Sequence, residues 1–552
     1  MGSLELFHTP EPPYVCRLAT DQVSVRLKVT GTVERCGLEF QGRSVPMQLL
    51  GQLPGEEVYQ AEVPYESQAP YRFQVWQHGQ LHWLGKGGSG PEVESFVLPD
   101  LVPFLTPQWV KDAVFYQIFP DRFANGDPGN DPPQVEPWGG EPTKSNYFGG
   151  DLQGIVKRLD YLAELGVNAL YLNPLFASST NHRYHTRDYY QIDSHLGTSE
   201  DLRQLVKACH QRGMHLILDG VFNHTGTDFW AFRAAEQHGP SSRYWHWYTF
   251  RGYPVVQTPT PNYLAWWGLR ELPQLNHANP EVREYLLQVA EYWIREFDID
   301  GWRLDVPNEI PHRFWQEFRR RVKALKPDAY IVGEIWDQAT PWLQGDQFDG
   351  VMNYQFRNAV RDFVTGKLDG AGLAHALTHV YLEYPPPAWA ALYNLLDSHD
   401  TERFFTLVSG DGRLFQLGLA LLLLYPGAPA LYYGDEVGVT GGKDPENRRC
   451  FPWEPQQQDR ALQSWVRRLV RLRHAHPVLR HGHPWCAGSG EVFTCRLSLN
   501  GQALLLVLNR GEHTHLALGL AKARELLSHA RYVADAAGLM AIPPRSALLL
   551  AP

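Results

Sequence analysis

The 552-residue sequence is poor in cysteine, and its six cysteines form no pattern. They show no CxxC pair and no spacing typical of zinc ligands, and they stand at Cys16, Cys36, Cys209, Cys450, Cys486 and Cys495. This scatter argues against a disulfide-rich scaffold and against a zinc-binding module. It predicts free thiols in a reducing compartment.

Long hydrophobic segments are also missing. The longest apolar run, LGLALLLLY at 417–425, stops at a Pro-Gly pair and is too short to cross a bilayer. The first residues, MGSLELFHTPEPPY, contain no apolar core of a secretory signal. We therefore expect no membrane association and a cytoplasmic location.

The charge is neither large nor concentrated, whereas aromatic residues are plentiful. The formal charge is -10 without a long run of either sign, which argues against nucleic acid or a membrane surface as the main partner. Aromatic residues make up 12% of the chain. Two clusters, YWHWYTF (244–250) and YLAWWG (263–268), lie among Gly, Pro and polar residues. Rings in such stretches are suited to stacking on a ligand.

The chain is too long for one hydrophobic core, and its two ends differ from its middle. VSVRLKV (23–29) alternates apolar and polar residues, which predicts an N-terminal β-sandwich over 1–105. FTCRLSLNGQALLLVLN (493–509) places Asn-Gly between two strand-like runs, which predicts a hairpin in a C-terminal β-sandwich over 476–552.

The middle, 106–475, alternates short apolar runs with amphipathic helical segments. Eight runs are candidate strands, at 113–120, 168–174, 215–222, 301–306, 329–336, 348–354, 391–398 and 428–436. Eight β-α units predict a (β/α)8 TIM barrel of the α/β class. The largest gap follows the third strand, so we expect an inserted lobe at about 224–278.

Polar residues gather where four of these strands end, which is where a TIM barrel carries its chemistry. They are Asp219, Asn223 and His224; Arg303 and Asp305; Glu334 and Trp336; and Asp397, His399 and Asp400. A single strand-end Asp is more often a helix cap or a turn former, and a single His is more often an ordinary hydrogen-bonding residue. Independent structural roles do not require so many charged groups on one ring.

Two kinds of chemistry use such a ring. Retaining glycoside hydrolysis needs two carboxylates about 5 to 5.5 Å apart, one as nucleophile and one as acid/base. A metal site is the rival, because His and carboxylates also bind zinc or paired divalent ions. Against a metal, the sequence has no HxH or HExxH pair, and Arg303 next to Asp305 would repel a cation.

Four of these stretches, DGVFNH, GWRLDVPNE, GEIW and LLDSHD, resemble in order and spacing the signature regions of the alpha-amylase family of glycoside hydrolases. The resemblance implies Asp305 as nucleophile, Glu334 as general acid/base and Asp400 as the carboxylate that binds and distorts the sugar. It further implies that Arg303 orients Asp305, that His224 and His399 bind sugar hydroxyls, and that Asp219 is structural.

The local chemistry adds an expectation for the two principal carboxylates. Apolar neighbours of Glu334 should raise its pKa and keep the proton that a general acid needs. Arg303, on the same strand face as Asp305, should keep that carboxylate ionised.

The NEI that follows Asp305, and LPQLN at 272–276, are similar to the branch that holds cyclomaltodextrinases, neopullulanases and maltogenic amylases. Pro307 and Gln274 depart from the usual residues. In NHRYHTRDYY (181–190) the resemblance implies that Tyr184 stacks beneath the sugar, while His185 stands where Asp is usual. Trp336 would line the acceptor side and favour transfer to sugars.

The stretch RFANGDPGNDP is dense in oxygen ligands, and FGGD follows it. The candidate ligands are Asn125, Asp127, Asn130, Asp131, the Gly149 carbonyl and Asp151. Such hard oxygen donors suit calcium, and the branch resemblance favours a structural Ca²⁺. The alternative is an Asx-turn loop without metal.

Three functions fit the sequence. The first is a retaining α-glucan hydrolase that acts on maltodextrins, cyclodextrins or pullulan, with possible transglycosylation, or a related maltodextrin glucosidase. The second is a glucosyltransferase or isomerase that uses the same covalent intermediate. The third is a sugar-binding protein on an inactive barrel, whose hallmark would be loss of one of the three acidic residues, and all three are present.

The N-terminal domain resembles one that in relatives packs over a partner's active site in a homodimer.

Overall fold

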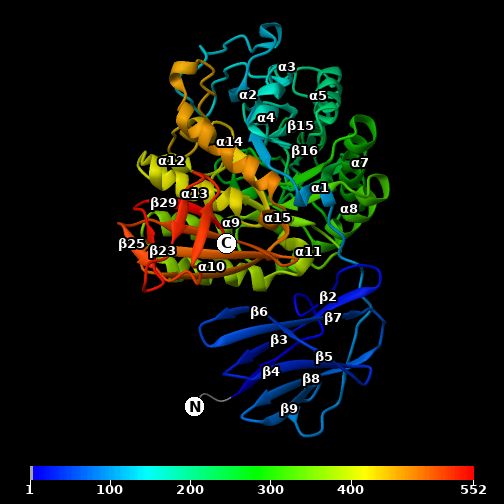
Figure 1. Cartoon of the computed structure of the whole chain (residues 1–552). Helices are drawn as coiled ribbons and strands as arrows, with labels where there is room; N and C mark the ends of the chain where they lie inside the picture. Colours follow the sequence, from blue (N-terminus) through cyan, green and yellow to red (C-terminus); the bar gives the residue numbers. More distant parts are fainter. Residues whose placement is uncertain (1–3) are drawn as a thin grey trace.

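The computed structural model describes residues 4–552 and has three parts along the chain (Figure 1). Two antiparallel sheets made of the N-terminal residues lie against one side of a central barrel, and the C-terminal strands form a sheet that packs beside its helices. The predicted fold class, an α/β TIM barrel flanked by two β-sheet domains, is confirmed.

The barrel is a closed ring of eight parallel strands in chain order. They are β12 (Phe115–Ile118), β13 (Ala169–Leu172), β16 (His215–Gly220), β17 (Gly301–Leu304), β18 (Tyr330–Gly333), β19 (Gly350–Asn353), β20 (Tyr393–Leu395) and β21 (Ala428–Tyr432). Each lies within one of the eight predicted ranges. The strands read as apolar runs because both of their faces are buried.

Helices surround the ring and turn one apolar face toward it. The longer ones are α5 (Ser199–Gln211), α7 (Pro280–Phe297), α8 (His312–Leu325), α9 (Tyr354–Val364), α10 (Gly370–Glu383), α13 (Gly412–Leu424) and α14 (Arg460–Ala475). In α7 the Asn279 side chain caps the first turn by accepting from Glu281 N. Its residues Val282, Leu286 and Val289 are fully buried, as their spacing predicts.

Shorter elements connect these units. Near the barrel they are α1 (Gln108–Lys111), α2 (Pro120–Phe123), α3 (Leu152–Lys157), α4 (Leu159–Leu165), β14 (Phe176–Ser178), β15 (Thr186–Ile192), α11 (Pro386–Trp389), α12 (Phe404–Leu407) and α15 (Val478–His481). The segment between β16 and α7 holds α6 (Trp230–His238) and short 3-10 turns, one of them over Trp266–Gly268. This is the region in which the sequence predicts an inserted lobe.

The N-terminal domain is built from two sheets whose inner faces share one apolar core. One sheet contains β1 (Glu5–Phe7), β2 (Val15–Arg17), β3 (Gln22–Thr30), β6 (Gln48–Leu53) and β7 (Glu56–Pro64). The other contains β4 (Arg35–Phe40), β5 (Arg43–Pro46), β8 (Pro70–Gln77), β9 (Gln80–Gly85), β10 (Gly88–Gly90) and β11 (Phe96–Val97). The buried Arg26 Nη1 donates across the boundary to the Leu382 carbonyl (2.9 Å) and so joins this domain to the barrel.

The C-terminal domain carries the predicted hairpin. Its main sheet runs in the order β22 (His483–Ser489), β23 (Val492–Leu499), β24 (Gln502–Asn509), β29 (Ser546–Ala551), β26 (Lys522–Glu525) and β27 (Arg531–Val533), and β25 (Thr514–Leu516) pairs with β28 (Met540–Ile542). At the turn between β23 and β24, Asn500 and Gly501 both have positive φ, at 48° and 79°. Two left-handed residues match the turn that this dipeptide favours.

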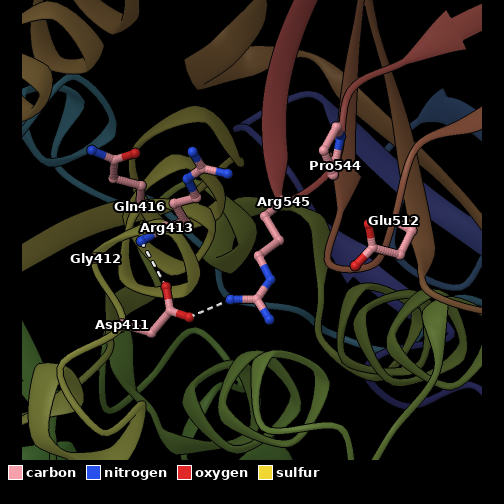
Figure 2. A pocket seen from close by; sticks show the side chains of 7 residues that line it. All are labelled: Asp411, Gly412, Arg413, Gln416, Glu512, Pro544 and Arg545. Carbon is pink, nitrogen blue, oxygen red and sulfur yellow. Dashed lines mark hydrogen bonds and ion pairs between the residues drawn. The ribbon is translucent and has the colours of Figure 1, made fainter.

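A hollow of about 650 Å³ lies where this domain meets the start of α13 (Figure 2). Arg545 of the C-terminal domain reaches Asp411, which caps α13, at 2.6 Å. None of the predicted site residues lines this hollow.

Among residues 4–552, no helix is long and apolar enough to cross a membrane.

Candidate active site

The carboxyl ends of four barrel strands bring the predicted catalytic residues together. Asp219 on β16 lies directly opposite Arg303 on β17, and both side chains are buried. The alternation of β17 sends Trp302 and Leu304 into the apolar layer under the helices, so Arg303 points the other way. Asp305 and Glu334 follow the ends of β17 and β18.

Arg303 is the centre of this group. Its Nη1 atom lies 2.9 Å from Asp219 Oδ1 and 2.9 Å from Asp305 Oδ1, and its Nη2 atom lies 2.9 Å from Glu334 Oε2. Burial alone would lower the pKa of Arg303, but the carboxylates of Asp219 and Glu334 raise it. The sequence predicts that Arg303 orients Asp305, and the structure places Glu334 on the same guanidinium.

Arg303 lowers the pKa of Asp305, as the sequence predicts, but the other surroundings of this carboxyl group act in the opposite direction. Burial raises the pKa of Asp305 by more than Arg303 lowers it, and Glu334 and Asp219 raise it further. Burial and Glu334 likewise raise the pKa of Asp400, to about 7. The sequence shows the nearby arginine but not the neighbouring carboxylates that share it, and these carboxylates raise the pKa of Asp305.

The backbone after Asp305 is strained. Val306 has φ 44° and ψ 46°, a left-handed conformation that β-branched residues rarely adopt. This turn aims the Val306 N–H at Glu334 Oε2, at 3.1 Å. Local strain therefore provides a second donor for the predicted acid/base.

Asp400 is held by a chain of hydrogen bonds that starts inside the barrel. Gln117 Nε2, on β12, donates to His399 Nδ1 (2.8 Å), so the proton of the neutral imidazole lies on Nε2. That atom is 3.0 Å from Asp400 Oδ2. Burial and the cations Arg303 and Arg448 lower the pKa of His399, which keeps the ring neutral.

Tyr184 joins the two halves of the site. Its hydroxyl donates to Asp219 Oδ2 (2.7 Å) and lies 2.6 Å from His399 Nε2. Its ring is nearly parallel to the His399 ring, with centroids 5.3 Å apart and 5° between planes. The structure thus places Tyr184 beside the predicted cleavage position, and its stacking on sugar stays a prediction.

His224 is buried at the end of β16 and faces a tryptophan. Its ring lies 5.4 Å from that of Trp266, at 24°. Burial lowers the pKa of His224 to about 3, so the ring is neutral. Its Nε2 atom has no hydrogen-bond partner within the described part of the chain, which leaves it free for a ligand.

Trp336 has two contacts. Its Nε1–H donates to Glu334 Oε1 (3.2 Å), and its ring stacks on Tyr354 at 3.8 Å and 9°. The side chain is still 45% exposed. Sequence reasoning predicts that Trp336 lines the acceptor side but does not predict its hydrogen bond to Glu334.

Sequence reasoning missed several supporting residues. Asn447 Nδ2 and Arg448 Nε both donate to the His399 carbonyl, at 2.8 and 3.0 Å, and Arg448 Nη2 lies 3.8 Å from Asp400 Oδ1. Only folding brings this loop after β21 to the site. Gln117 could have been found, because a polar residue inside the apolar strand run FYQIF needs a partner.

The predicted calcium ligands also lie together. Asn125 Nδ2 donates to Asp131 Oδ1 (2.8 Å), and a Cβ on Gly149 would meet that same oxygen at 2.1 Å. The Asp151 carboxylate accepts from Gly126 N, Asp127 N and Gly154 N, so it caps α3. Between residues 4 and 552, no group of three or more His, Cys, Asp or Glu side chains is arranged as a metal site. Calcium would therefore need amide and backbone oxygens in addition to carboxylates.

A sequence model of the alpha-amylase catalytic domain matches residues 117–496. The chain belongs to the alpha-amylase family. The enzyme is 46% identical over 459 residues to a cyclomaltodextrinase of Geobacillus thermopakistaniensis, covering 81% of this chain and 78% of the relative. It is 42% identical over 533 residues to neopullulanase 2 of Thermoactinomyces vulgaris, covering 92% and 91%. A solved cyclomaltodextrinase superposes with a TM-score of 0.92 over 99% of each chain, at 36% identity.

The predicted branch is confirmed: the enzyme is a glycoside hydrolase of the cyclomaltodextrinase, neopullulanase and maltogenic amylase type, and it acts on α-glucan oligosaccharides. The residues that depart from the usual motifs make contacts with their neighbours. Gln274 Nε2 donates to Asn223 Oδ1 (3.1 Å), and the Pro307 carbonyl accepts from Trp315 Nε1 (2.9 Å). The His185 carbonyl accepts from Ser178 Oγ (2.7 Å).

Proposed function

We propose that the enzyme cleaves α-1,4-glucosidic bonds of maltodextrins, cyclodextrins or pullulan with retention of configuration, through a covalent glycosyl-enzyme intermediate. The observation that carries this proposal is the contact of one guanidinium, that of Arg303, with both Asp305 and Glu334 at 2.9 Å. Retaining hydrolysis needs a nucleophile and a proton donor on nearby carboxyl groups. A shared cation keeps the two groups in one site.

In the first step Asp305 attacks the anomeric carbon while the glycosidic C–O bond breaks, and Glu334 gives its proton to the leaving oxygen. In the second step Glu334 takes a proton from a water molecule, which attacks the same carbon and releases Asp305. Asp400 and His399 bind hydroxyls of the sugar at the cleavage position. His224, whose Nε2 is free, binds another, and Tyr184 stacks beneath the ring.

A transfer reaction is the second candidate outcome, and Trp336 is the observation that favours it. The indole ring is 45% exposed, and its Nε1–H lies 3.2 Å from Glu334 Oε1, so a sugar that stacks on it is close to the group that activates the acceptor. An acceptor hydroxyl then replaces water in the second step. Release of glucose from short maltodextrins would mark a maltodextrin glucosidase instead.

One experiment separates these outcomes. The enzyme is incubated with β-cyclodextrin, pullulan, starch and maltotriose, and the products and their anomeric form are identified by NMR and chromatography. We expect α-anomers and preferential cleavage of the short or cyclic substrates. Initial products of β configuration would refute the retaining mechanism, and new linkages at high sugar concentration would identify transfer.

We also propose a structural calcium ion at the 125–131 loop. Asn130 Oδ1 is buried and has no hydrogen-bond partner among the described residues. Partial burial raises the pKa of Asp131, and Asp151 adds to this although Asn125 opposes it. A cation would satisfy the amide oxygen and offset the repulsion, with Asp127, Asn130, Asp131 and the Gly149 carbonyl as ligands and Asp151 and Asn125 as supports. Its contribution would be to order the loop, away from the chemistry.

Chelation tests this proposal. EDTA should lower the Tm, and added Ca²⁺ should restore it, because an ion that binds only the folded state stabilises that state. The variant Asn130→Ala should lose this response. An unchanged Tm in EDTA would support the Asx-turn loop without metal.

We further propose a cytoplasmic homodimer that associates through the N-terminal domain. Apolar side chains are exposed on that domain, including Phe7, Leu81 and Val97. The six cysteines are free, as expected in a reducing compartment. Light scattering during gel filtration should show twice the monomer mass, and a monomer at all concentrations would refute the dimer.

A further inference from the structure

Two of the six cysteines face each other in the C-terminal sheet. Cys486 on β22 and Cys495 on β23 are direct partners in the antiparallel register, and their sulfur atoms lie 3.7 Å apart. The other four lie on separate segments: Cys16 on β2, Cys36 on β4, Cys209 on α5 and Cys450 in the loop before α14. The site described above uses none of the six.

We propose that Cys486 and Cys495 are a redox-active dithiol that closes reversibly into a cross-strand disulfide when a small-molecule disulfide is available. Opposed residues of antiparallel strands have Cα atoms about 4.5 to 5.5 Å apart, within the range of about 4.4 to 6.8 Å that disulfides span. The sulfur atoms must approach to about 2.05 Å. Closure therefore requires the two side chains to rotate toward each other from their present sulfur–sulfur separation of 3.7 Å.

The two thiols differ in access, and this difference sets the order of the steps. Cys486 is half-buried, whereas Cys495 is fully buried. The thiolate of Cys486 attacks one sulfur of a small-molecule disulfide and releases one thiol, which leaves a mixed disulfide on Cys486. The thiolate of Cys495 then attacks Cys486 Sγ and releases the second thiol. The protein loses two protons and two electrons, and the external disulfide is reduced to two thiols.

The surroundings of Cys495 make the second step slow at neutral pH. Burial and the neighbouring Cys486 raise the pKa of Cys495 well above that of an ordinary thiol. Few Cys495 side chains are therefore thiolates at pH 7, and closure accelerates as the pH rises. Tyr425 of the barrel faces the same pair of thiols. Burial and the two thiols raise the pKa of Tyr425, so this neighbour does not supply a positive charge that would lower the pKa of Cys495.

Closure would link the edge strand of the sheet covalently to its neighbour. β22 is an edge strand, paired on one side with β23, and Cys486 packs against the main core of the barrel. A covalent bond between β22 and β23 removes freedom from the unfolded chain, so the oxidised protein should unfold at a higher temperature. The catalytic contacts come from other elements, so kcat should stay within twofold of its value in the reduced enzyme.

The test uses the full-length enzyme, equilibrated in oxidised glutathione at pH 8.5 and compared with a dithiothreitol-treated sample. We expect thiol titration after denaturation to fall from six to four, a mass loss of two hydrogen atoms, and a peptide that links Cys486 to Cys495. The Tm should rise by a few degrees. Dithiothreitol should reverse all of these changes.

Three variants complete the design. Cys486→Ser removes the accessible thiol at a half-buried position and should abolish the linked peptide and the Tm rise, while Cys36→Ser, on a separate strand, should preserve both. Cys495→Ser should stop at a glutathione adduct on Cys486. Six free thiols in the oxidised wild-type sample, or a linked pair other than 486–495, would overturn the proposal.

Discussion

Strand β17 connects two buried acidic residues whose surroundings are opposite. Asp300 precedes the strand and accepts from His210 Nε2 (2.9 Å), Lys326 Nζ (2.9 Å) and Leu216 N (2.8 Å). Asp305 follows the strand and shares the single cation Arg303 with Asp219 and Glu334. The two residues stand five positions apart in the sequence.

The pKa shifts follow from this difference. Burial alone would raise the pKa of Asp300, but hydrogen bonds from His210, His215 and Lys326 lower it far below the usual range. At Asp305, burial and neighbouring carboxylates outweigh Arg303 and raise the pKa. Abundant donors at one end of the strand stabilise an ionised carboxylate that supports the fold, whereas at the other end three carboxylates share one cation at the predicted catalytic position.

The largest expected effect is at the catalytic end. Asp305→Asn should reduce kcat/KM on maltotriose by about 10³-fold or more, because it removes the nucleophile. It should leave the Tm unchanged or higher, since an ionised Asp305 is unfavourable in the folded state. Kinetics and thermal unfolding of one preparation check this. A variant with reduced Tm and retained activity would instead make Asp305 a structural residue.

Glu334→Gln should also lose activity on maltotriose by about 10²-fold or more, because it removes the acid/base. The loss should be smaller on α-maltosyl fluoride, whose leaving group needs no proton. The matched Asp305→Asn variant should show no such recovery. Equal losses on both substrates would remove Glu334 from the role of general acid.

At the structural end, Asp300→Asn should lower the free energy of unfolding by about 2 kcal/mol, because Lys326 and His210 lose a buried charged partner. The kcat of the folded fraction should be unchanged. Urea unfolding followed by tryptophan fluorescence measures the change. Asp298→Asn is the control, since the Asp298 side chain is mostly exposed.

The smallest effect is the dependence of stability on pH. The pKa of Asp300 is lowered, so its contribution is present above the unfolded value of about 3.9 and is lost as the pH falls below it. The hydrogen bond to Asp300 raises the pKa of His210, although burial opposes this. The His210 contribution is therefore full below about pH 6.5 and is lost as the pH rises through its raised value. Asp300→Asn should make the Tm depend less on pH, both in the acidic range and above about pH 6.5. An unchanged plot of Tm against pH would contradict this account.

Much of the fold could be predicted from the sequence. Each of the eight barrel strands lies within its predicted range, because buried parallel strands have the sequence pattern of short apolar runs between helical segments. The Asn500-Gly501 hairpin was predictable because few dipeptides accept two positive φ angles. The residues Asp305, Glu334 and Asp400 could be found because they stand at strand ends within ordered motifs.

The rest required partners that are distant in the chain. Arg448 and Asn447 reach His399 from a loop about 50 residues away, and no local pattern signals those contacts. The strain at Val306 is likewise invisible in the residue itself.

The sequence by itself determined the eightfold alternation, the positions of the acidic residues and the family, since these depend on periodicity and on residue order. Only the tertiary structure decided how the buried charges shift one another's pKa values. The reason is that a pKa in a buried site depends on every charge around it, and Arg303 must serve Asp219 and Glu334 as well as Asp305. The opposed thiols of Cys486 and Cys495 are a second case, because their contact depends on the register of two strands.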